Sequence, residues 1–160
     1  MTESKGYIIR EARLDDLPVL LQFEQDLIKV ERPMNPTIKS GKISYYDVAA
    51  FIKADDSTVL VAEKNGEVCA SGYARILDDR AYLTHDKQGY LGFMFTAEGH
   101  RGKGLNQEIV RALVQWCDER GIHEIKLDVY PANKAAIRAY EKMGFYPHMI
   151  NMRLNRDRED

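Results

Sequence analysis

The chain has 160 residues, 44% of them apolar and 30% charged, which is ordinary for a globular protein of one domain and excludes a disordered or fibrous chain. Its formal net charge of -2 provides no overall basic field of the kind on which nucleic-acid binding relies. No stretch approaches the ~20 apolar residues of a membrane helix, and the first residues lack the apolar core of a secretory signal, so we expect a cytoplasmic protein with no nucleic-acid or membrane partner.

The cysteines and histidines are spaced in a way that favours neither a disulfide nor a metal site. Cys69 lies in a strand-like run and Cys117 in a helix-like run, and they do not form a CxxC pair. We therefore expect two packed thiols. The four histidines are scattered without a pair four residues apart, so we expect no bound metal.

The first half of the chain predicts a strand, two helices and a β-hairpin. Pro18 suits the first turn of a helix, where a missing N–H costs nothing, whereas Pro33 cannot continue that helix. Ser44 is a candidate N-cap for a second helix, and Asn65-Gly66 is the strongest short signal for a tight hairpin turn. The expected elements are a strand at 7–12, a helix at 15–30, a loop at 31–36, a helix at 44–55, and strands at 58–63 and 67–77.

The second half predicts alternating strands and helices. Gly121 and Gly144 are suited to end two helices, and Asn133 to cap the second of them. The expected elements are strands at 89–96, 124–130 and 146–154, helices at 102–120 and 133–143, and a charged tail at 155–160. This order predicts an α/β (α+β type) fold, in which one mixed sheet is covered by helices on both faces.

The most informative segment is Arg101-Gly102-Lys103-Gly104, between a predicted strand and a long predicted helix. The first N–H groups of a helix lack partners and carry the positive end of its dipole, so they bind anions. Glycine lets the backbone approach a ligand and take conformations that a Cβ disfavours. Two basic side chains add positive charge, and together these features predict a diphosphate site.

The spacing around this loop excludes two common nucleotide motifs. A P-loop needs Gly at position 97 and Ser or Thr after Lys103, but the chain has Ala97 and Gly104. A dinucleotide fingerprint that starts at Gly102 needs Gly or Ala at position 107, where Gln107 stands. Without further signals, the two glycines are also compatible with a tight strand-to-helix connection that binds nothing.

Further signals come from a resemblance that covers 7–154. The run Arg101 to Asn106 resembles the Arg/Gln-x-x-Gly-x-Gly/Ala motif of the GNAT superfamily of acyl-CoA N-acyltransferases, although Asn106 replaces its final Gly or Ala. Asn133, Ala139-Tyr140 and Gly144-Phe145 resemble a second block of that family at about the expected distance. The resemblance implies a single N-acetyltransferase domain at 1–160, a mainly antiparallel mixed sheet of six to seven strands, and acetyl-CoA as cosubstrate without a metal.

The same resemblance implies which residues hold acetyl-CoA. The backbone of the strand before the loop would pair with the pantetheine arm, and one of its N–H groups would donate to the thioester oxygen. The loop amides would hold the pyrophosphate, and Asn133 would bond the arm as well as cap its helix. The implied cofactor residues are Met94, Phe95, Thr96, Arg101, Gly102, Lys103, Gly104, Leu105, Asn106, Asn133 and Tyr140.

The resemblance makes Tyr140 the candidate general acid for the leaving thiolate; the alternative is an aromatic residue packed on an apolar helix face. Several relatives have a glutamate base on the strand before the loop, and Gly92 occupies that place here. The base would then be a water chain or a carboxylate elsewhere, such as Glu31, Glu63 or Asp78, each of which is otherwise a solvated acid.

The acceptor cleft implied by the family lies between 30–44 and 78–88. The candidate substrate-binding residues are Arg32, Tyr45, Tyr46 and Tyr82, and they indicate no substrate class. The expected function is direct acetyl transfer, in a ternary complex, to a primary amine of a small molecule or peptide. The alternatives are a catalytically silent acyl-CoA-binding sensor and a structural protein without ligand. Pairing into a homodimer is expected from the family alone.

Overall fold

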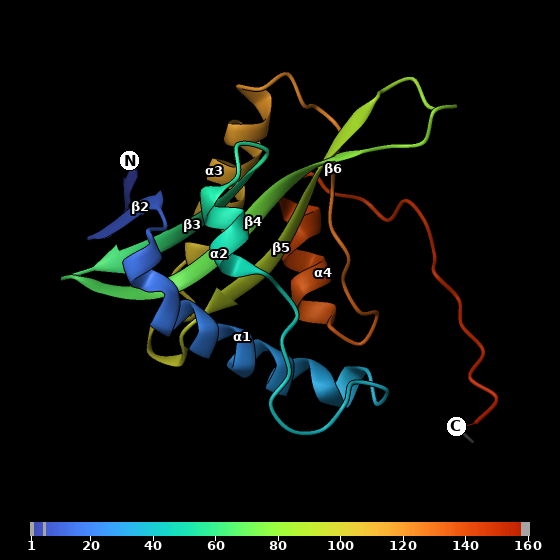
Figure 1. The fold of residues 1–160 in the computed structure, drawn as a ribbon, viewed down its shortest axis with the longest axis horizontal. Coiled ribbons are helices and arrows are strands. Elements are labelled where there is room, and N and C mark those ends of the chain that lie inside the picture. Colours follow the sequence, from blue (N-terminus) through green and yellow to red (C-terminus); the bar gives the residue numbers. More distant parts are fainter. Residues whose placement is uncertain (1, 5, 158–160) are drawn as a thin grey trace.

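The fold is built on one mixed sheet, in a computed structural model that describes residues 2–4 and 6–157 (Figure 1). The strands follow chain order across the sheet, and every neighbouring pair is antiparallel except β5 and β6, which are parallel. The strands are β1 (Thr2–Ser4), β2 (Tyr7–Glu11), β3 (Ser57–Lys64), β4 (Glu67–Asp78), β5 (Lys87–Thr96) and β6 (Ile125–Lys126). The predicted mainly antiparallel sheet of six to seven strands is therefore confirmed, with six strands in the described chain.

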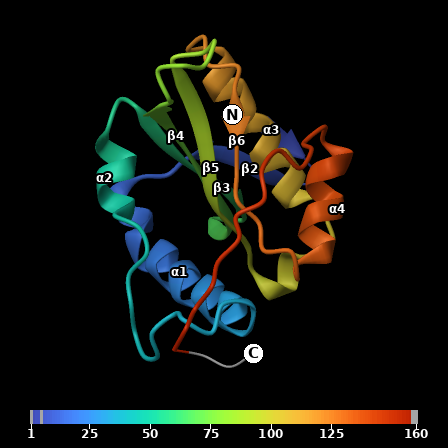
Figure 2. The same ribbon diagram turned by 90° about the vertical axis from the view of Figure 1, so that its right-hand side faces the viewer.

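Helices cover both faces of the sheet, as predicted (Figure 2). On one face Leu20 and Val48 pack against Phe93, and on the other Ile109 packs in a second core with Leu91. Helices α1 (Leu17–Glu31) and α2 (Val48–Lys53) lie on the first face, and α3 (Leu105–Asp118) and α4 (Lys134–Lys142) on the second. Three 3-10 turns are η1 (Leu14–Asp16), η2 (Arg32–Met34) and η3 (Glu98–His100).

Three local turn and cap signals are confirmed. Asn65 and Gly66 have φ values of 52° and 80°, which is the left-handed conformation required by a tight hairpin turn. The side chain of Asn133 accepts a hydrogen bond of 3.3 Å from the backbone N–H of Ala136, so it caps α4 as predicted. Gly144 has a φ of 100° just after that helix. Each of these features depends only on neighbours in sequence.

A bulge interrupts the pairing of β4 with β5. Phe93 and Met94 stand opposite the single residue Gly72, and Phe93 has a φ of 57°, which is rare for a bulky side chain. A Cβ on Gly72 would lie 2.7 Å from the Sδ of Met94, so a larger residue would not fit there. The extra residue turns Phe93 and Phe95 toward α1 and α2 and Met94 toward α3. The bulge thus reshapes β5 where the sequence predicts cofactor contacts.

The C-terminal half of the predicted sheet is wrong in two places. The strand expected at 124–130 is reduced to Ile125–Lys126, and no strand forms at 146–154. That last segment is extended but unpaired, and Tyr146, Ile150 and Met152 are 79%, 84% and 88% exposed. An apolar alternation forms a strand only beside a free edge of matching length, and β6 provides two residues. The sheet gains β1 instead, which pairs with the start of β2.

Two helix starts also differ from the expectation. Asp47, not Ser44, caps α2, because its side chain accepts a 3.2 Å hydrogen bond from the N–H of Ala50. Helix α3 begins at Leu105 rather than at 102. Gly102 and Gly104 have φ values of 77° and 79°, and a right-handed helix cannot pass through that conformation. The glycines therefore form the loop before the helix.

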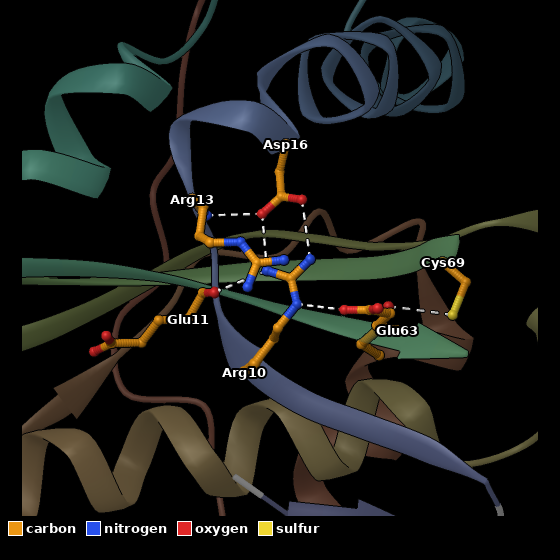
Figure 3. Close-up of polar contacts among 7 residues, drawn as sticks. Arg10, Glu11, Arg13, Asp16, Glu63 and Cys69 are labelled. Atoms are coloured by element: carbon orange, nitrogen blue, oxygen red, sulfur yellow. Dashed lines mark hydrogen bonds and ion pairs between the residues drawn. The ribbon is translucent and has the colours of Figure 1, made fainter. Parts of the chain in front are cut away.

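A buried ion-pair network joins β2, β3 and the start of α1 (Figure 3). The guanidinium of Arg10 donates two hydrogen bonds to the carboxylate of Asp16, at 2.8 and 3.0 Å, and one of 2.5 Å to Glu63. The backbone N–H of Arg13 donates a further 2.7 Å bond to Asp16. The side chains of Arg10 and Asp16 are only 8% and 10% exposed. The hydrogen bond from Arg10 is the main reason that the pKa of Asp16 is lowered.

We expect Asp16→Ala to reduce the free energy of unfolding at pH 7 by about 3 kcal/mol, because a buried guanidinium loses its bidentate partner. Since the folded pKa of Asp16 is lowered, its contribution is fully present above its unfolded pKa of about 4 and is lost as pH falls toward the folded pKa. Urea unfolding at pH 7, 5 and 3 measures this. The exposed neighbour Asp15→Ala is the control, and an Asp16→Ala cost that does not shrink at pH 3 would contradict the prediction.

Candidate active site

One edge of β5 is open where the chain after β6 leaves the sheet. The two strands pair only at Gly89 with Ile125 and at Tyr90 with Lys126. Beyond Tyr90, no strand of the described chain lies beside this edge of β5, which continues to Thr96. Backbone groups on an open strand edge can bond an extended ligand as an added strand would. The edge therefore suits a linear amide-containing molecule.

The loop predicted to bind a diphosphate lies just beyond the end of β5. Arg101, Gly102, Lys103 and Gly104 are all exposed, and no heavy atom lies within 4 Å of the positions that a Cβ would occupy on either glycine. The glycines are therefore required by their positive φ values rather than by crowding. The first amides of α3, starting at Leu105, have no carbonyl partner within the helix, and they carry the positive end of a 14-residue helix dipole. Open space, helix-start amides and positive charge are the features that suit an anion, so the anion site stays a prediction.

Polar contacts attach the loop to the sheet. The Nε of Arg101 donates a 3.0 Å hydrogen bond to the carbonyl oxygen of Thr96, and its guanidinium carbon lies 5.8 Å from the ring centroid of Phe95. The backbone N–H of Ala97 donates a 2.8 Å bond to the carbonyl oxygen of Cys69 on β4. The end of the open strand and the anion loop thus form one continuous surface.

Tyr140 lies next to the loop. Burial raises the pKa of its phenol, and the side chain of Asn106, in the first turn of α3, lies close enough to lower that pKa in part. The ring also packs edge-on against Phe145, with centroids 5.8 Å apart. Both sequence-based readings of Tyr140 are therefore compatible with its position: the ring is packed and the hydroxyl reaches the start of α3. Its phenol stays protonated at neutral pH.

A second group of polar side chains lies at the end of α1 and before α2. Burial raises the pKa of the Glu31 carboxyl, and the hydroxyl of Tyr45 lies close enough to lower that pKa in part. Burial and the charge of Glu31 raise the pKa of Tyr45 to about 12. The carboxylate of Glu24, 1% exposed, accepts hydrogen bonds from the backbone N–H groups of Tyr45 and Tyr46 at 3.0 and 2.8 Å. Glu24 thereby fixes the segment that carries both tyrosines.

A row of tyrosine rings connects this group to the open end of β5. The ring of Tyr46 lies 5.3 Å from that of Tyr73, which lies 6.5 Å from that of Tyr90. The hydroxyl of Tyr90 donates a 2.7 Å hydrogen bond to Asp128, beyond β6. Burial raises the pKa values of all three phenols. Tyr73, Tyr90 and Asp128 could not be recognised from the sequence, because they lie on β4, on β5 and after β6 and carry no motif.

The packing of the Tyr73 ring explains why position 92 is a glycine. A Cβ at position 92 would lie 2.5 Å from both the hydroxyl oxygen and the Cζ of Tyr73. Tyr73 is itself 4% exposed and packs against Tyr46, Phe51 and Tyr90. The Tyr73 phenol thus fills the space that a side chain at position 92 would occupy.

We expect Gly92→Ala to lower the free energy of unfolding by about 1–3 kcal/mol, because the new methyl group overpacks the Tyr73 ring. The melting temperature of a chain of this size should fall by roughly 2–10 °C. Gly99→Ala is the control, since a Cβ there would meet no heavy atom within 4 Å. Equal melting temperatures for Gly92→Ala and the wild type would show that Tyr73 moves aside without cost.

Three other residues singled out from the sequence, namely Glu63, Tyr82 and Asp78, lie apart from Glu31. Glu63 is held by Arg10 beside the start of α1, and the 15-residue helix separates it from Glu31 by roughly 20 Å. Tyr82, 74% exposed, lies on the β4–β5 hairpin loop away from the end of α1 (Figures 1 and 2). Asp78 pairs with Lys87 in that hairpin. Arg32 does border the second group, but it donates to the carbonyl oxygens of Lys39 and Gly41.

Both cysteines are buried free thiols, as predicted, and burial raises the pKa of Cys69 and of Cys117 to about 11. Within residues 2–4 and 6–157, no group of three or more His, Cys, Asp or Glu side chains is arranged to hold a metal ion. In the same part of the chain, no helix has both the length and the apolar character needed to cross a membrane.

Comparison with known proteins identifies a matching family and relatives in sequence. The acetyltransferase (GNAT) family model matches residues 25–145. Streptothricin acetyltransferase of Streptomyces lavendulae is 30% identical over 92 residues, which are 58% of this chain and 46% of that protein. The chain spans only 25% of the length of an uncharacterized N-acetyltransferase of Bacillus subtilis that it also matches.

Solved structures share the fold. The tetramutant of the BH1408 protein from Bacillus halodurans superposes with a TM-score of 0.81 at 23% identity, over 92% of this chain and 99% of that chain. A predicted acetyltransferase from Clostridium acetobutylicum, solved with acetyl-CoA, gives a TM-score of 0.72 at 21% identity, over 93% and 96%. At these identities the likeness establishes the fold alone.

Proposed function

Since the chain belongs to the acetyltransferase (GNAT) family, we propose that it transfers the acetyl group of acetyl-CoA to a primary amine of a small molecule or peptide. The observation that carries the proposal is the continuity of the open β5 edge with the loop from Arg101 to Gly104. An extended arm and a terminal diphosphate are the two parts of CoA that such a surface fits. A structural neighbour was solved with acetyl-CoA, which supports the choice of ligand.

The cofactor residues follow from that surface. The backbone of Met94, Phe95 and Thr96 would bond the pantetheine arm, and the amides from Gly102 to Asn106 would bond the diphosphate. The remaining contacts would come from the side chains of Arg101 and Lys103, which add positive charge, and from Asn133 at the start of α4. The bulge at Phe93 turns backbone groups away from regular pairing with β4, which makes one of their N–H groups the candidate donor to the thioester oxygen.

We assign the general base to Glu31 rather than to Glu63. Burial raises the pKa of the Glu31 carboxyl, which brings it closer to the range in which a base is effective at neutral pH. Its partner Tyr45, with Tyr46 and Arg32, would border the acceptor. Glu63 is engaged by Arg10 in a network that stabilises the fold. Glu31 would take the proton that the amine loses when its nitrogen bonds the acetyl carbon.

Tyr140 would act as the general acid. As the C–S bond breaks, the phenol donates its proton to the departing sulfur and recovers one from solvent. The influence of Asn106 on the pKa of this phenol indicates that the hydroxyl lies near the start of α3, next to the loop that would hold the diphosphate. Acetyl-CoA supplies the activated thioester and the amine supplies the nucleophile. Glu31 would supply the base, Tyr140 the acid, and a backbone N–H of β5 the donor to the thioester oxygen.

The test is release of free CoA thiol from acetyl-CoA over a panel of amino acids, polyamines, aminoglycosides and peptides, together with calorimetric binding of CoA. We expect binding and turnover with at least one amine. The rate should rise with pH as Glu31 loses its proton, and Glu31→Gln should remove that rise. Millimolar acetyl-CoA that fails to raise the melting temperature would overturn the proposal. Binding without turnover over the whole panel would favour the silent acyl-CoA sensor.

The expected homodimer stays a prediction. The unpaired segment 146–154, with its exposed apolar side chains, is available for self-association, and its Arg153 donates hydrogen bonds to the side chains of Asn35 and Thr37 after α1. Sedimentation equilibrium of the purified chain tests whether a dimer forms.

A further inference from the structure

One buried side-chain pair connects the sheet to the anion loop. Tyr7, the first residue of β2, is 1% exposed, and its hydroxyl lies 2.8 Å from the Nδ1 of His100. The two rings meet edge to face, with centroids 5.7 Å apart and an interplanar angle of 82°. His100 is the last residue of η3 and directly precedes Arg101. The contact therefore acts at the entry to the loop.

Either tautomer of the His100 ring allows this hydrogen bond. With the ring proton on Nε2, the Tyr7 hydroxyl donates to Nδ1, and with the proton on Nδ1, the ring donates to the hydroxyl oxygen. We expect the first arrangement, because a buried hydroxyl hydrogen needs an acceptor.

The loop needs this support because the hydrogen bond that closes η3, the turn before the loop, is long. The backbone hydrogen bond from Arg101 to the carbonyl of Glu98, which closes η3, is 3.4 Å long. Gly102 and Gly104 follow, and glycine restricts the backbone least of all residues. The bond between Arg101 and Thr96 holds one side of the entry. The His100 ring, bonded to the buried Tyr7, holds the other.

We propose that Tyr7 and His100 are positioning residues for the CoA diphosphate. Their hydrogen bond fixes the backbone that leads into Arg101. The loop amides are then already oriented toward the anion, so that binding does not require the loop to lose conformational entropy. The inference rests on the proposed function, because it concerns the same CoA site. The pair does not touch the reacting thioester, so it should affect binding and leave the chemical step unchanged.

The test compares two ligands that share the thioester arm: acetyl-CoA, and acetyl-pantetheine, which lacks the diphosphate together with the 3′-phosphoadenosine attached to it. Tyr7→Phe keeps the ring and its contact with Lys64, whose Nζ lies 4.9 Å from the ring centroid, and removes only the hydroxyl. We expect its Kd for acetyl-CoA, measured by calorimetry, to rise about three- to tenfold. The Kd for acetyl-pantetheine and the kcat at saturating acetyl-CoA should stay unchanged.

Two variants of His100, one without and one with a hydrogen-bond acceptor, form a matched pair. His100→Phe should reproduce the loss for acetyl-CoA, whereas His100→Asn, which keeps an acceptor close to the Nδ1 position, should retain much of the affinity. His100 is partly exposed, so these variants carry the test even if Tyr7→Phe fails to fold. A nitrogen-15 spectrum of the His100 ring should show the Nε2–H tautomer in the wild type.

Three results would overturn the inference. Equal losses for both ligands would indicate a general structural role, and unchanged affinity for acetyl-CoA in all variants would show that the loop is ordered without the pair. If the wild type binds acetyl-pantetheine as tightly as acetyl-CoA, the diphosphate contributes nothing to the affinity and the loop is not an anion site. If the wild type binds neither ligand, the proposed function fails first, which separates that outcome from the other three.

Discussion

Replacing Arg101 and Lys103 together by glutamate is expected to weaken CoA binding by about 100-fold, because two attractive charges at a diphosphate become repulsive. Both side chains are exposed at the loop before α3, so the fold should be retained. The side chain of Arg101 also bonds the carbonyl of Thr96, and loss of that bond would add to the effect. Calorimetry with CoA measures the affinity, and the melting temperature without ligand checks the fold.

The control for this experiment is a double reversal with the same change in net charge elsewhere. Lys53 at the end of α2 and Arg156 in the C-terminal tail are exposed and outside the proposed site. Lys53→Glu with Arg156→Glu should bind CoA like the wild type. Raising the salt concentration should weaken binding to the wild type and not to the Arg101/Lys103 double variant. Unchanged CoA affinity in that variant would remove the loop from the cofactor site.

Tyr140→Phe is expected to lower kcat by about 100-fold with little change in the affinity for acetyl-CoA, because general acid catalysis contributes on this scale. The substitution removes only the hydroxyl and keeps the edge-on contact with Phe145. Burial raises the pKa of this phenol, so it is protonated over the neutral range and can donate. Steady-state kinetics with the best amine of the panel separate kcat from KM.

Two variants make the Tyr140 result specific. Tyr146→Phe alters a tyrosine that is 79% exposed in the unpaired segment and should leave kcat unchanged. Asn106→Ala removes the side chain that lies close to the Tyr140 phenol, and an intermediate loss of kcat is expected from a less well-placed proton donor. Wild-type turnover in Tyr140→Phe would leave that residue with a packing role alone.

The position of Asn106 changes how its departure from the family motif is understood. In the sequence, Asn106 is only a departure from the final Gly or Ala of the motif. In the structure it lies in the first turn of α3 and its side chain meets the phenol of Tyr140 on α4. The residue that departs from the motif thus connects the candidate anion site to the candidate acid.

The acceptor side of the site shows the limit of sequence reasoning most clearly. Glu31, Tyr45 and Tyr46 were candidates by their place in the chain, but their relation to Tyr73 was not predictable. Tyr73 reaches the group only because Gly92 on the neighbouring strand leaves room for its ring. Strand register determines that contact, and register depends on the pairing of whole strands.

By itself, the sequence determined features that depend on short-range backbone chemistry: the hairpin turn at Asn65-Gly66, the cap at Asn133 and the left-handed glycine at Gly144 after α4. Each is decided by the conformations open to a few adjacent residues. Only the tertiary structure decided that 146–154 stays unpaired, that Glu63 belongs to the Arg10 network, and that Tyr7 meets His100 from 93 residues away. Those outcomes depend on which edges and faces meet in space, and no local pattern encodes that.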